Sequence, residues 1–292
     1  MNIVEAINSL PSLRTIVDAY GLLAKKSLGQ NFLLDSNITD KIVRYTLQKQ
    51  NLDSFYGAHL FEVGSGPMGL TRSCLKSDPN KMTIIELDER CIKIAQDIQS
   101  KIPNKLEIIN QDALKYDFSF PENMPKHILS NLPYNISVPL FTKWLFEIKS
   151  YQSLTLMFQK EVADRIEASI RTKEYGRLSV LSQLQCNITR LFNLPPEAFT
   201  PAPKVWSSVL LFTPRNDALD IKNIKQLEKI TAIAFAKRRK MLRQIFKSIP
   251  NFDKICEICE ILPTMRPEEL SPKQFLNLSN TYNILDKAAM LT

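Results

Sequence analysis

The feature that most constrains the fold of this chain is an alternation of short apolar runs with longer amphipathic stretches. The runs are rich in β-branched and aliphatic residues, as strands are, and the stretches between them have the polarity pattern of helices. The runs cover residues 59–63, 82–86, 106–110, 127–130 and 154–158. Strands that alternate with helices form parallel sheets with helices on both faces. The pattern therefore predicts a doubly wound α/β sheet.

Two later segments extend this plan. Residues 187–194 and 205–212 have strand composition and are joined by a proline-rich connection, which predicts an antiparallel hairpin added to the sheet. After Pro214 the strand signals stop, and the rest of the chain has the composition of helices broken by prolines. We therefore expect an α/β domain over residues 1–215 and a smaller all-α domain over residues 216–292.

A glycine-rich turn follows the first predicted strand. Residues 61–69 read Phe-Glu-Val-Gly-Ser-Gly-Pro-Met-Gly and hold three of the seven glycines of the chain. Glycine lets the backbone approach a ligand closely, and Glu86, at the end of the next strand, stands where an acid can bind ribose hydroxyls. This arrangement fits NAD and S-adenosylmethionine equally. Pro67 lacks the N–H that a pyrophosphate cradle needs, so a cofactor without phosphates is favoured.

Asp112 follows the third predicted strand. Its carboxylate can accept a hydrogen bond from an adenine amino group, and the ends of successive parallel strands face one crevice. Taken alone, Asp112 would be an ordinary turn aspartate. Together with the glycine turn and Glu86, it becomes a candidate cofactor ligand.

The turn after the fourth predicted strand contains the candidate catalytic residues. Residues 130–135 read Ser-Asn-Leu-Pro-Tyr-Asn. An adenine amino nitrogen is a poor nucleophile, and its methylation becomes feasible when two acceptors hold its hydrogens. The side-chain oxygen of Asn131 and the carbonyl of Leu132 are candidates for this role. Pro133 would stiffen the turn and Tyr134 would stack on the base, although such a run is in isolation also simply a good turn.

Histidine and cysteine usage points away from metal chemistry. The two histidines, His59 and His127, disfavour His-based hydrolysis and a zinc site, and the reaction above needs no general base before transfer. We interpret Cys256 and Cys259 as two small apolar residues on a helix face. Five scattered cysteines and an N-terminal stretch without a long apolar run predict a cytoplasmic protein that does not span a membrane.

Residues 221–247 hold nine basic side chains and a single acid, Glu228, so their net charge of +8 equals that of the whole chain. Such a block is a candidate phosphate-binding surface, although a solvated helix face remains an alternative. On a helical wheel, one stripe is apolar and the side chains opposite are basic. The apolar stripe contains Leu227, Ile230, Ala234, Met241 and Ile245, and the basic face contains Arg239, Lys240, Arg243 and Lys247.

Arg238 does not fit this wheel, because it falls within the apolar sector. Either the helix breaks near Lys237 or the arginine is turned inward.

In their order along the chain, these motifs resemble those of the ribosomal RNA adenine N6-dimethyltransferases, in particular the bacterial small-subunit type. The resemblance covers nearly the whole chain. It is carried by the glycine turn and by residues 25–33 (Lys-Lys-Ser-Leu-Gly-Gln-Asn-Phe-Leu), 85–88, 111–113, 131–136, 159–162, 175–179 (Tyr-Gly-Arg-Leu-Ser), 199–205 (Phe-Thr-Pro-Ala-Pro-Lys-Val) and 238–240.

The resemblance implies a Rossmann-like S-adenosylmethionine-dependent methyltransferase sheet and methyl transfer at residues 131–134. Its substrate would be a pair of adjacent adenines near the 3′ end of small-subunit ribosomal RNA, each methylated twice, in an immature small subunit. We expect the enzyme to act as a monomer. The implied cofactor contacts are Asn31, Leu33, Gly64, Glu86, Asp112 and Asn131.

The expected RNA contacts come from two places. Phe199 resembles a second aromatic platform of the family for a base swung out of its stack, with a packed core phenylalanine as the alternative. The basic contacts would be Arg238, Arg239, Lys240, Arg243 and Lys247.

One departure from the family pattern concerns the glycine turn, where Met68 stands in place of the third glycine and Gly69 lies one residue late. We therefore assign Gly69 no cofactor contact. Two alternatives stay open at this point: a large-subunit enzyme of the macrolide-resistance type, and a ribosome-assembly factor with secondary methylation. A dehydrogenase is disfavoured because no hydride-transfer residues are evident and Pro67 lies in the loop.

Overall fold

The computed structural model describes residues 3–25, 28–102, 105–119 and 123–289. The chain forms two compact units. The first, here called the sheet unit, comprises residues 1–143, 149–160 and 189–213, and the second, the helical unit, comprises residues 144–148, 161–188 and 214–292. Residues 161–188, which we expected in the first domain, thus form one compact unit with the C-terminal helices. The division of roles between residues 1–215 and 216–292 stays a prediction.

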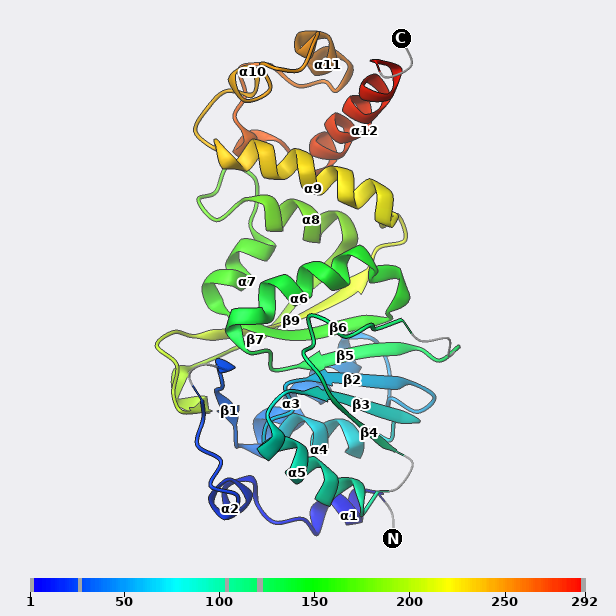
Figure 1. The fold of residues 1–292 in the computed structure, drawn as a ribbon, viewed down its shortest axis with the longest axis vertical. Coiled ribbons are helices and arrows are strands. Elements are labelled where there is room, and N and C mark those ends of the chain that lie inside the picture. Colours follow the sequence, from blue (N-terminus) through cyan, green and yellow to red (C-terminus); the bar gives the residue numbers. More distant parts are fainter. Residues whose placement is uncertain (1–2, 26–27, 103–104, 120–122, 290–292) are drawn as a thin grey trace. The chain divides into compact units, whose positions relative to one another are not determined.

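Within the part of the chain that the structure describes, the main sheet has seven strands in the order β4-β3-β2-β5-β6-β9-β7. The pairs from β4 through β6 are parallel, and β9 runs antiparallel to β6, with Leu156 opposite Leu210. Figure 1 shows these strands side by side. The predicted doubly wound sheet with an antiparallel addition is confirmed. The strands are β2 (His59–Val63), β3 (Lys81–Glu86), β4 (Leu106–Asn110), β5 (Lys126–Ser130), β6 (Ser153–Gln159), β7 (Cys186–Leu194) and β9 (Ser207–Pro214).

A second, two-stranded sheet pairs β1 (Phe32–Leu33) with β8 (Phe199–Thr200) in antiparallel fashion. Leu33 lies opposite Phe199 in this pair. This sheet was not predicted, because strands of two residues have no periodicity to detect.

Helices connect the parallel strands and bury their apolar faces on the sheet. Asp35 and Asp88 cap α3 and α5, each accepting a hydrogen bond from a backbone N–H of the first turn. Central strand residues such as Leu60, Ile84 and Leu129 are fully buried. The helices are α1 (Ile3–Asn8), α2 (Leu13–Ala19), α3 (Ser36–Lys49), α4 (Gly69–Lys76), α5 (Glu89–Gln99) and α6 (Tyr134–Phe146), with 3-10 turns η2 (Ile148–Ser150) and η3 (Pro196–Ala198).

The helical unit is built around α9, which packs against α8 and α12. Ile224, Leu227, Ile230 and Ala234 form its buried stripe. Its elements are α7 (Lys160–Glu167), α8 (Arg177–Gln185), α9 (Ile221–Ala236), α10 (Leu242–Ile245), α11 (Phe252–Ile258), η4 (Pro267–Glu269) and α12 (Pro272–Ala289).

Residues 221–247 do not form one helix, so the single helical wheel was wrong beyond Ala236. Helix α9 ends there with Lys237 as its C-cap, and α10 begins at Leu242. The chain between them turns, and the N–H groups of Leu242 and Arg243 donate to the carbonyls of Met265 and Pro263. These two N–H groups therefore bond to a distant segment of the chain and not to the preceding turn of a continuous helix.

All five cysteines are buried thiols, Cys256 and Cys259 on and next to α11 among them. Within the described ranges, no cluster of three or more His, Cys, Asp or Glu side chains could hold a metal ion. No helix in that part of the chain is long and apolar enough to cross a membrane.

Candidate active site

One pocket of the sheet unit lies at the carboxyl ends of β2, β3, β4 and β5, where parallel strands present their following turns to a common crevice. Each turn singled out in the sequence contributes to its wall, and residues 28–33 complete it. The structure therefore brings together residues that are more than a hundred positions apart. The predicted site residues that line the pocket are Asn31, Leu33, Gly64, Glu86, Asp112, Asn131, Leu132, Pro133 and Tyr134.

The glycine turn after β2 depends on left-handed backbone and on close approach. Gly64 and Gly66 have φ angles of +73° and +52°. A Cβ on Gly64 would lie 3.2 Å from Cδ of Pro133, and one on Gly66 would lie 3.0 Å from Cδ1 of Phe32. Side chains there would push the walls of the pocket apart.

Met68, the departure from the family pattern, also adopts a left-handed conformation, with φ +71° as the N-cap residue of α4. Its side chain is fully buried, and burial offsets the cost of this backbone for a residue other than glycine. Gly69 lines the pocket as well, and a Cβ there would lie 2.8 Å from the carbonyl oxygen of Leu33. The absence of a side chain at Gly69 therefore leaves room for residues 31–33 to pack against α4.

Glu86, at the end of β3, is buried, and backbone donors hold its carboxylate in place. Oε1 accepts from the N–H groups of Leu87 and Asp88 at 2.8 and 2.9 Å, and Oε2 accepts from the N–H of Gly66 at 3.1 Å. Burial raises the pKa of Glu86, while these backbone hydrogen bonds oppose the rise. The side chain therefore links the turn after β3 to the glycine turn after β2.

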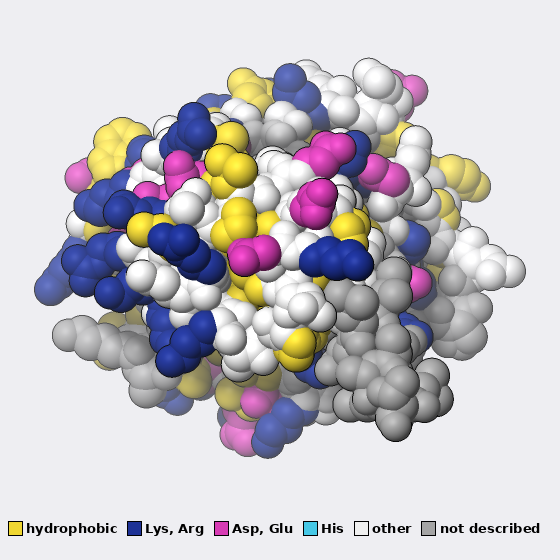
Figure 2. Space-filling view, turned by 90° about the horizontal axis from the view of Figure 1, so that it is seen from above, with side chains coloured by type: hydrophobic (Ala, Val, Ile, Leu, Met, Phe, Trp, Pro, Cys, Tyr) yellow, Lys and Arg dark blue, Asp and Glu magenta, His cyan; other side chains and the backbone are white. Residues whose placement is uncertain are grey.

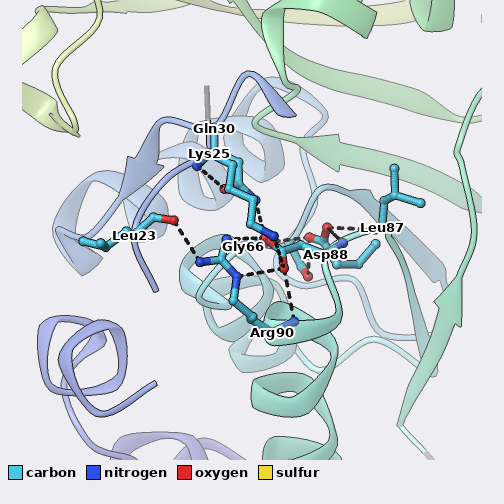
Figure 3. Close-up of polar contacts among 9 residues, drawn as sticks. Leu23, Lys25, Gln30, Gly66, Leu87, Asp88 and Arg90 are labelled. Carbon is cyan, nitrogen blue, oxygen red and sulfur yellow. Dashed lines mark hydrogen bonds and ion pairs between the residues drawn. The ribbon is translucent and has the colours of Figure 1, made fainter. Parts of the chain in front are cut away.

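Asp88, two residues on, is the centre of the network in Figure 3. Arg90 binds it through Nε at 3.0 Å and Nη2 at 2.6 Å, and Gln30 Nε2 donates to it at 3.0 Å. The Arg90 guanidinium holds the pKa of the Asp88 carboxyl well below its usual range. Asp88 thereby ties the segment before β1 to the β3 end. We did not predict this role, although an aspartate two residues before an arginine was a visible signal in the sequence.

We call residues 23–25 and 28–33 the strap. Arg90 Nη1 donates to the carbonyl of Leu23 at 3.0 Å, and the N–H of Lys25 donates to Oε1 of Gln30 at 2.9 Å. At its other end the strap pairs with β8 through Phe32 and Leu33. The strap is therefore fixed at both ends where it forms a wall of the pocket.

The turn after β5 presents Asn131. Its Nδ2 donates to the carbonyl oxygen of Asn31 in the strap at 3.0 Å, which leaves Oδ1 as an acceptor. Tyr134 is half-buried, and its hydroxyl shares a 2.7 Å hydrogen bond with Oγ of Ser207, the first residue of β9. Burial raises the pKa of Tyr134, so its hydroxyl stays protonated at neutral pH. Ser207 was not predicted, since it lies seventy-three residues away in the chain.

Glu62, on β2, also borders the pocket, and our sequence analysis gave it no role. It is buried with the Thr71 hydroxyl as a hydrogen-bond donor. Burial raises its pKa to about 8. A mostly protonated carboxyl group therefore lies under the glycine turn at neutral pH.

Phe199 lies in the core cluster of the sheet unit, only 3% exposed, and it does not line the pocket. Its backbone pairs with that of Leu33 in β1, and both side chains belong to the same core cluster. This geometry is that of a packed core phenylalanine, the alternative given above. The role of Phe199 as a platform for RNA stays a prediction.

Arg238 is turned inward within the helical unit. Its Nε donates to Glu268 at 2.6 Å, its Nη2 to the carbonyl of Thr172 at 2.7 Å, and its Nη1 to the carbonyl of Lys173. Both alternatives weighed in the sequence therefore occur: the helix ends at Ala236, and the arginine binds protein. Its guanidinium holds together two segments far apart in the chain.

The other predicted basic residues, Arg239, Lys240, Arg243 and Lys247, are exposed. On the face drawn in Figure 2, Lys and Arg side chains gather most densely at the left, the side on which α10 lies in Figure 1. This exposure leaves the four side chains accessible to phosphates.

Comparison with known proteins gives consistent matches. The family model described as Ribosomal RNA adenine dimethylase matches residues 21–284. A relative from Paramagnetospirillum magneticum, named Ribosomal RNA small subunit methyltransferase A, is 42% identical, and the match covers 92% of this chain and 94% of the relative.

Two solved structures have similar folds. A dimethyladenosine transferase from Plasmodium falciparum has a TM-score of 0.70 at 26% identity, over 86% of this chain and 96% of that one. The 23S rRNA methyltransferase ErmE has a TM-score of 0.62 at 21% identity, over 87% of this chain and all of that one, and it shares the fold.

Proposed function

Because the chain belongs to the ribosomal RNA adenine dimethylase family, we propose that it dimethylates the N6 amino groups of two adjacent adenines near the 3′ end of small-subunit ribosomal RNA. It is an enzyme that uses S-adenosylmethionine, as the resemblance implied. The matches to relatives named for the small subunit, at 42–43% identity over most of the chain, support the small-subunit assignment over the large-subunit one.

The pocket fits the cofactor. At Gly64 and Gly66 the turn packs closely against Pro133 and Phe32, with no room for a Cβ, and Glu86 presents a carboxylate already oriented by three backbone N–H groups. In this proposal Glu86 accepts hydrogen bonds from the ribose hydroxyls and Asp112 from the adenine amino group, while Asn31 and Leu33 close the wall from the strap. When bound, the cofactor supplies an electrophilic methyl group.

The observation that carries the proposal is the fixed side chain of Asn131. Because its amide nitrogen is committed to the carbonyl of Asn31, its Oδ1 can accept one hydrogen of the target amino group. The carbonyl of Leu132 accepts the other, and the two acceptors hold the nitrogen lone pair toward the methyl donor. Tyr134 stacks on the base, with its hydroxyl fixed by Ser207. The proton leaves after transfer, once the nitrogen is cationic.

For the RNA, the proposal uses Arg239, Lys240, Arg243 and Lys247 as phosphate contacts and assigns Arg238 to the structure of the helical unit. We further infer a monomer that acts in the cytoplasm on an immature small subunit. The buried thiols support a reducing compartment.

Methyl transfer from labelled S-adenosylmethionine to unmethylated small subunits tests the proposal. The chain should label the ribosomal RNA, and Asn131→Ala should lower kcat by about 100- to 1000-fold, the usual cost of removing one stabilising group at a reacting centre. Cofactor binding, measured separately by calorimetry, should weaken far less. Equal labelling by the two proteins would exclude Asn131 from the transfer step, and no labelling by the unmodified chain would exclude the substrate.

A further inference from the structure

The loop between η3 and β9 exposes an aromatic residue other than the one expected. Phe199 is buried, whereas Trp206, at the end of the same loop, is 50% exposed. Its neighbours Val205 and Lys204 are exposed as well. An exposed indole beside another apolar side chain and a cation is a composition typical of surfaces that bind unpaired bases.

The backbone of Trp206 is fixed next to the methyl-transfer turn. The N–H of Lys160 donates to the Trp206 carbonyl at 2.8 Å. The following residue, Ser207, shares the hydrogen bond with the Tyr134 hydroxyl. Consecutive Cα atoms are about 3.8 Å apart, so the Cα of Trp206 lies about that distance from the Cα of Ser207, the residue that positions Tyr134. All of these residues belong to the sheet unit.

We propose that Trp206 is a stacking platform for an unpaired base of the substrate RNA that flanks the target adenine. The inference rests on the proposed function. Stacking on an indole tolerates any base because every base has a flat π-face. Trp206 would hold the strand on one side of the adenine while Tyr134 stacks on the adenine itself, and the exposed Lys204 lies where a neighbouring phosphate can be bound.

The location also separates Trp206 from the cofactor. Trp206 does not line the cofactor pocket, whereas Phe199 pairs with Leu33 in its wall. Loss of the Phe199 ring should therefore raise the KM for S-adenosylmethionine through the strap. Loss of the Trp206 indole should raise only the KM for RNA.

Steady-state methylation of unmethylated small subunits provides the first test. Trp206→Ala should raise the KM for subunits about tenfold, the usual effect of removing one stacked base, with kcat and the KM for S-adenosylmethionine unchanged. Trp206→Tyr should restore most of the affinity, since it keeps a ring. Tyr56→Ala, which removes an aromatic side chain of the sheet unit that is 77% exposed, is the matched control and should behave as the unmodified chain.

Fluorescence gives a second test that does not depend on methylation. The chain has two tryptophans, and Trp144 is fully buried, so collisional quenching by acrylamide reports mainly Trp206. A stem-loop RNA with two adjacent adenines in its loop should protect this signal in the unmodified chain, and Trp206→Phe should abolish the protected signal.

An unchanged KM for subunits in Trp206→Ala, or RNA binding without protection from acrylamide, would overturn the inference. So would protection by ribosomal proteins alone, which would make Trp206 a protein contact. If the unmodified chain labels no subunits, the proposed function fails, and the quenching experiment still decides whether Trp206 contacts RNA.

Discussion

The cofactor pocket and the basic segment of residues 221–247 hold their side chains in place by different means. In the pocket, parallel strands deliver each turn to the same edge, and buried hydrogen bonds then fix the side chains, as the backbone N–H groups do for Glu86. In the basic segment, most cations project into solvent, and Arg238 is the exception, with an ion pair and two carbonyl partners.

The difference indicates which substitutions should cost the most free energy of binding or folding. When a side chain held by several buried partners is removed, those partners lose their hydrogen bonds. When an exposed cation is removed, water takes its place and no group is left unsatisfied. Substitutions in the pocket should therefore have large and specific effects, and those in the basic segment small effects that depend on salt. Arg238 should behave as a pocket residue does, despite its place in the sequence.

Outside the methyl-transfer turn, the largest effect is expected for Glu86→Ala. It removes the proposed ribose acceptor and leaves three backbone N–H groups without their partner, and charged hydrogen bonds of this kind are worth about 1.5–3 kcal/mol. Affinity for S-adenosylmethionine should fall by about 100-fold in calorimetry. Glu89→Ala, which removes an exposed acid at the start of α5, is the control and should bind normally. Similar affinities of both variants for S-adenosylmethionine would show that Glu86 does not bind the cofactor.

The next effect should be that of Arg238→Ala on stability. The substitution removes the ion pair with Glu268 and the donors to the carbonyls of Thr172 and Lys173. Because the side chain is about one-third exposed, solvent screens part of the loss, and we expect about 2 kcal/mol less unfolding free energy. Urea unfolding measures it, and Arg239→Ala should be neutral. If Arg238→Ala instead changed only the salt dependence of RNA binding, its structural role would be refuted.

The contrast also explains what could be predicted from the sequence. The strands and the four turns at their ends were predictable, because parallel topology places every such turn at one edge whatever the helices do. The break after Ala236 was one of two alternatives that the position of Arg238 left open. The sequence could not choose between them, since no glycine or proline marks the break and the N–H groups of Leu242 and Arg243 are satisfied by residues 263–265. The β1–β8 pair and the Tyr134–Ser207 hydrogen bond likewise depend on tertiary structure alone.

Glu62 tests whether burial alone perturbs an acid in the pocket. Its pKa rises from 4.5 to about 8 on folding, so between these values the folded protein binds more protons than the unfolded chain. The free energy of unfolding should therefore fall as the pH rises through this range, by at most about 1.4 kcal/mol per pH unit. Glu62→Gln, which resembles the protonated acid, should remove this slope in urea unfolding across pH 5–8. An unchanged slope would show that Glu62 is ionised when folded.

The smallest effect is expected from Arg239→Ala combined with Lys240→Ala. Both side chains are exposed, so stability should be unchanged, and affinity for the RNA at moderate salt should fall by about 1 kcal/mol. The informative quantity is the salt slope, which should become shallower by about one for each phosphate that the variant no longer binds. Lys93→Ala with Lys101→Ala removes the same charge from exposed positions on α5 and just after it, and should leave the slope nearly unchanged. Equal slope changes in both double variants would mean that net charge acts at long range, and that no local phosphate-binding surface exists beside α10.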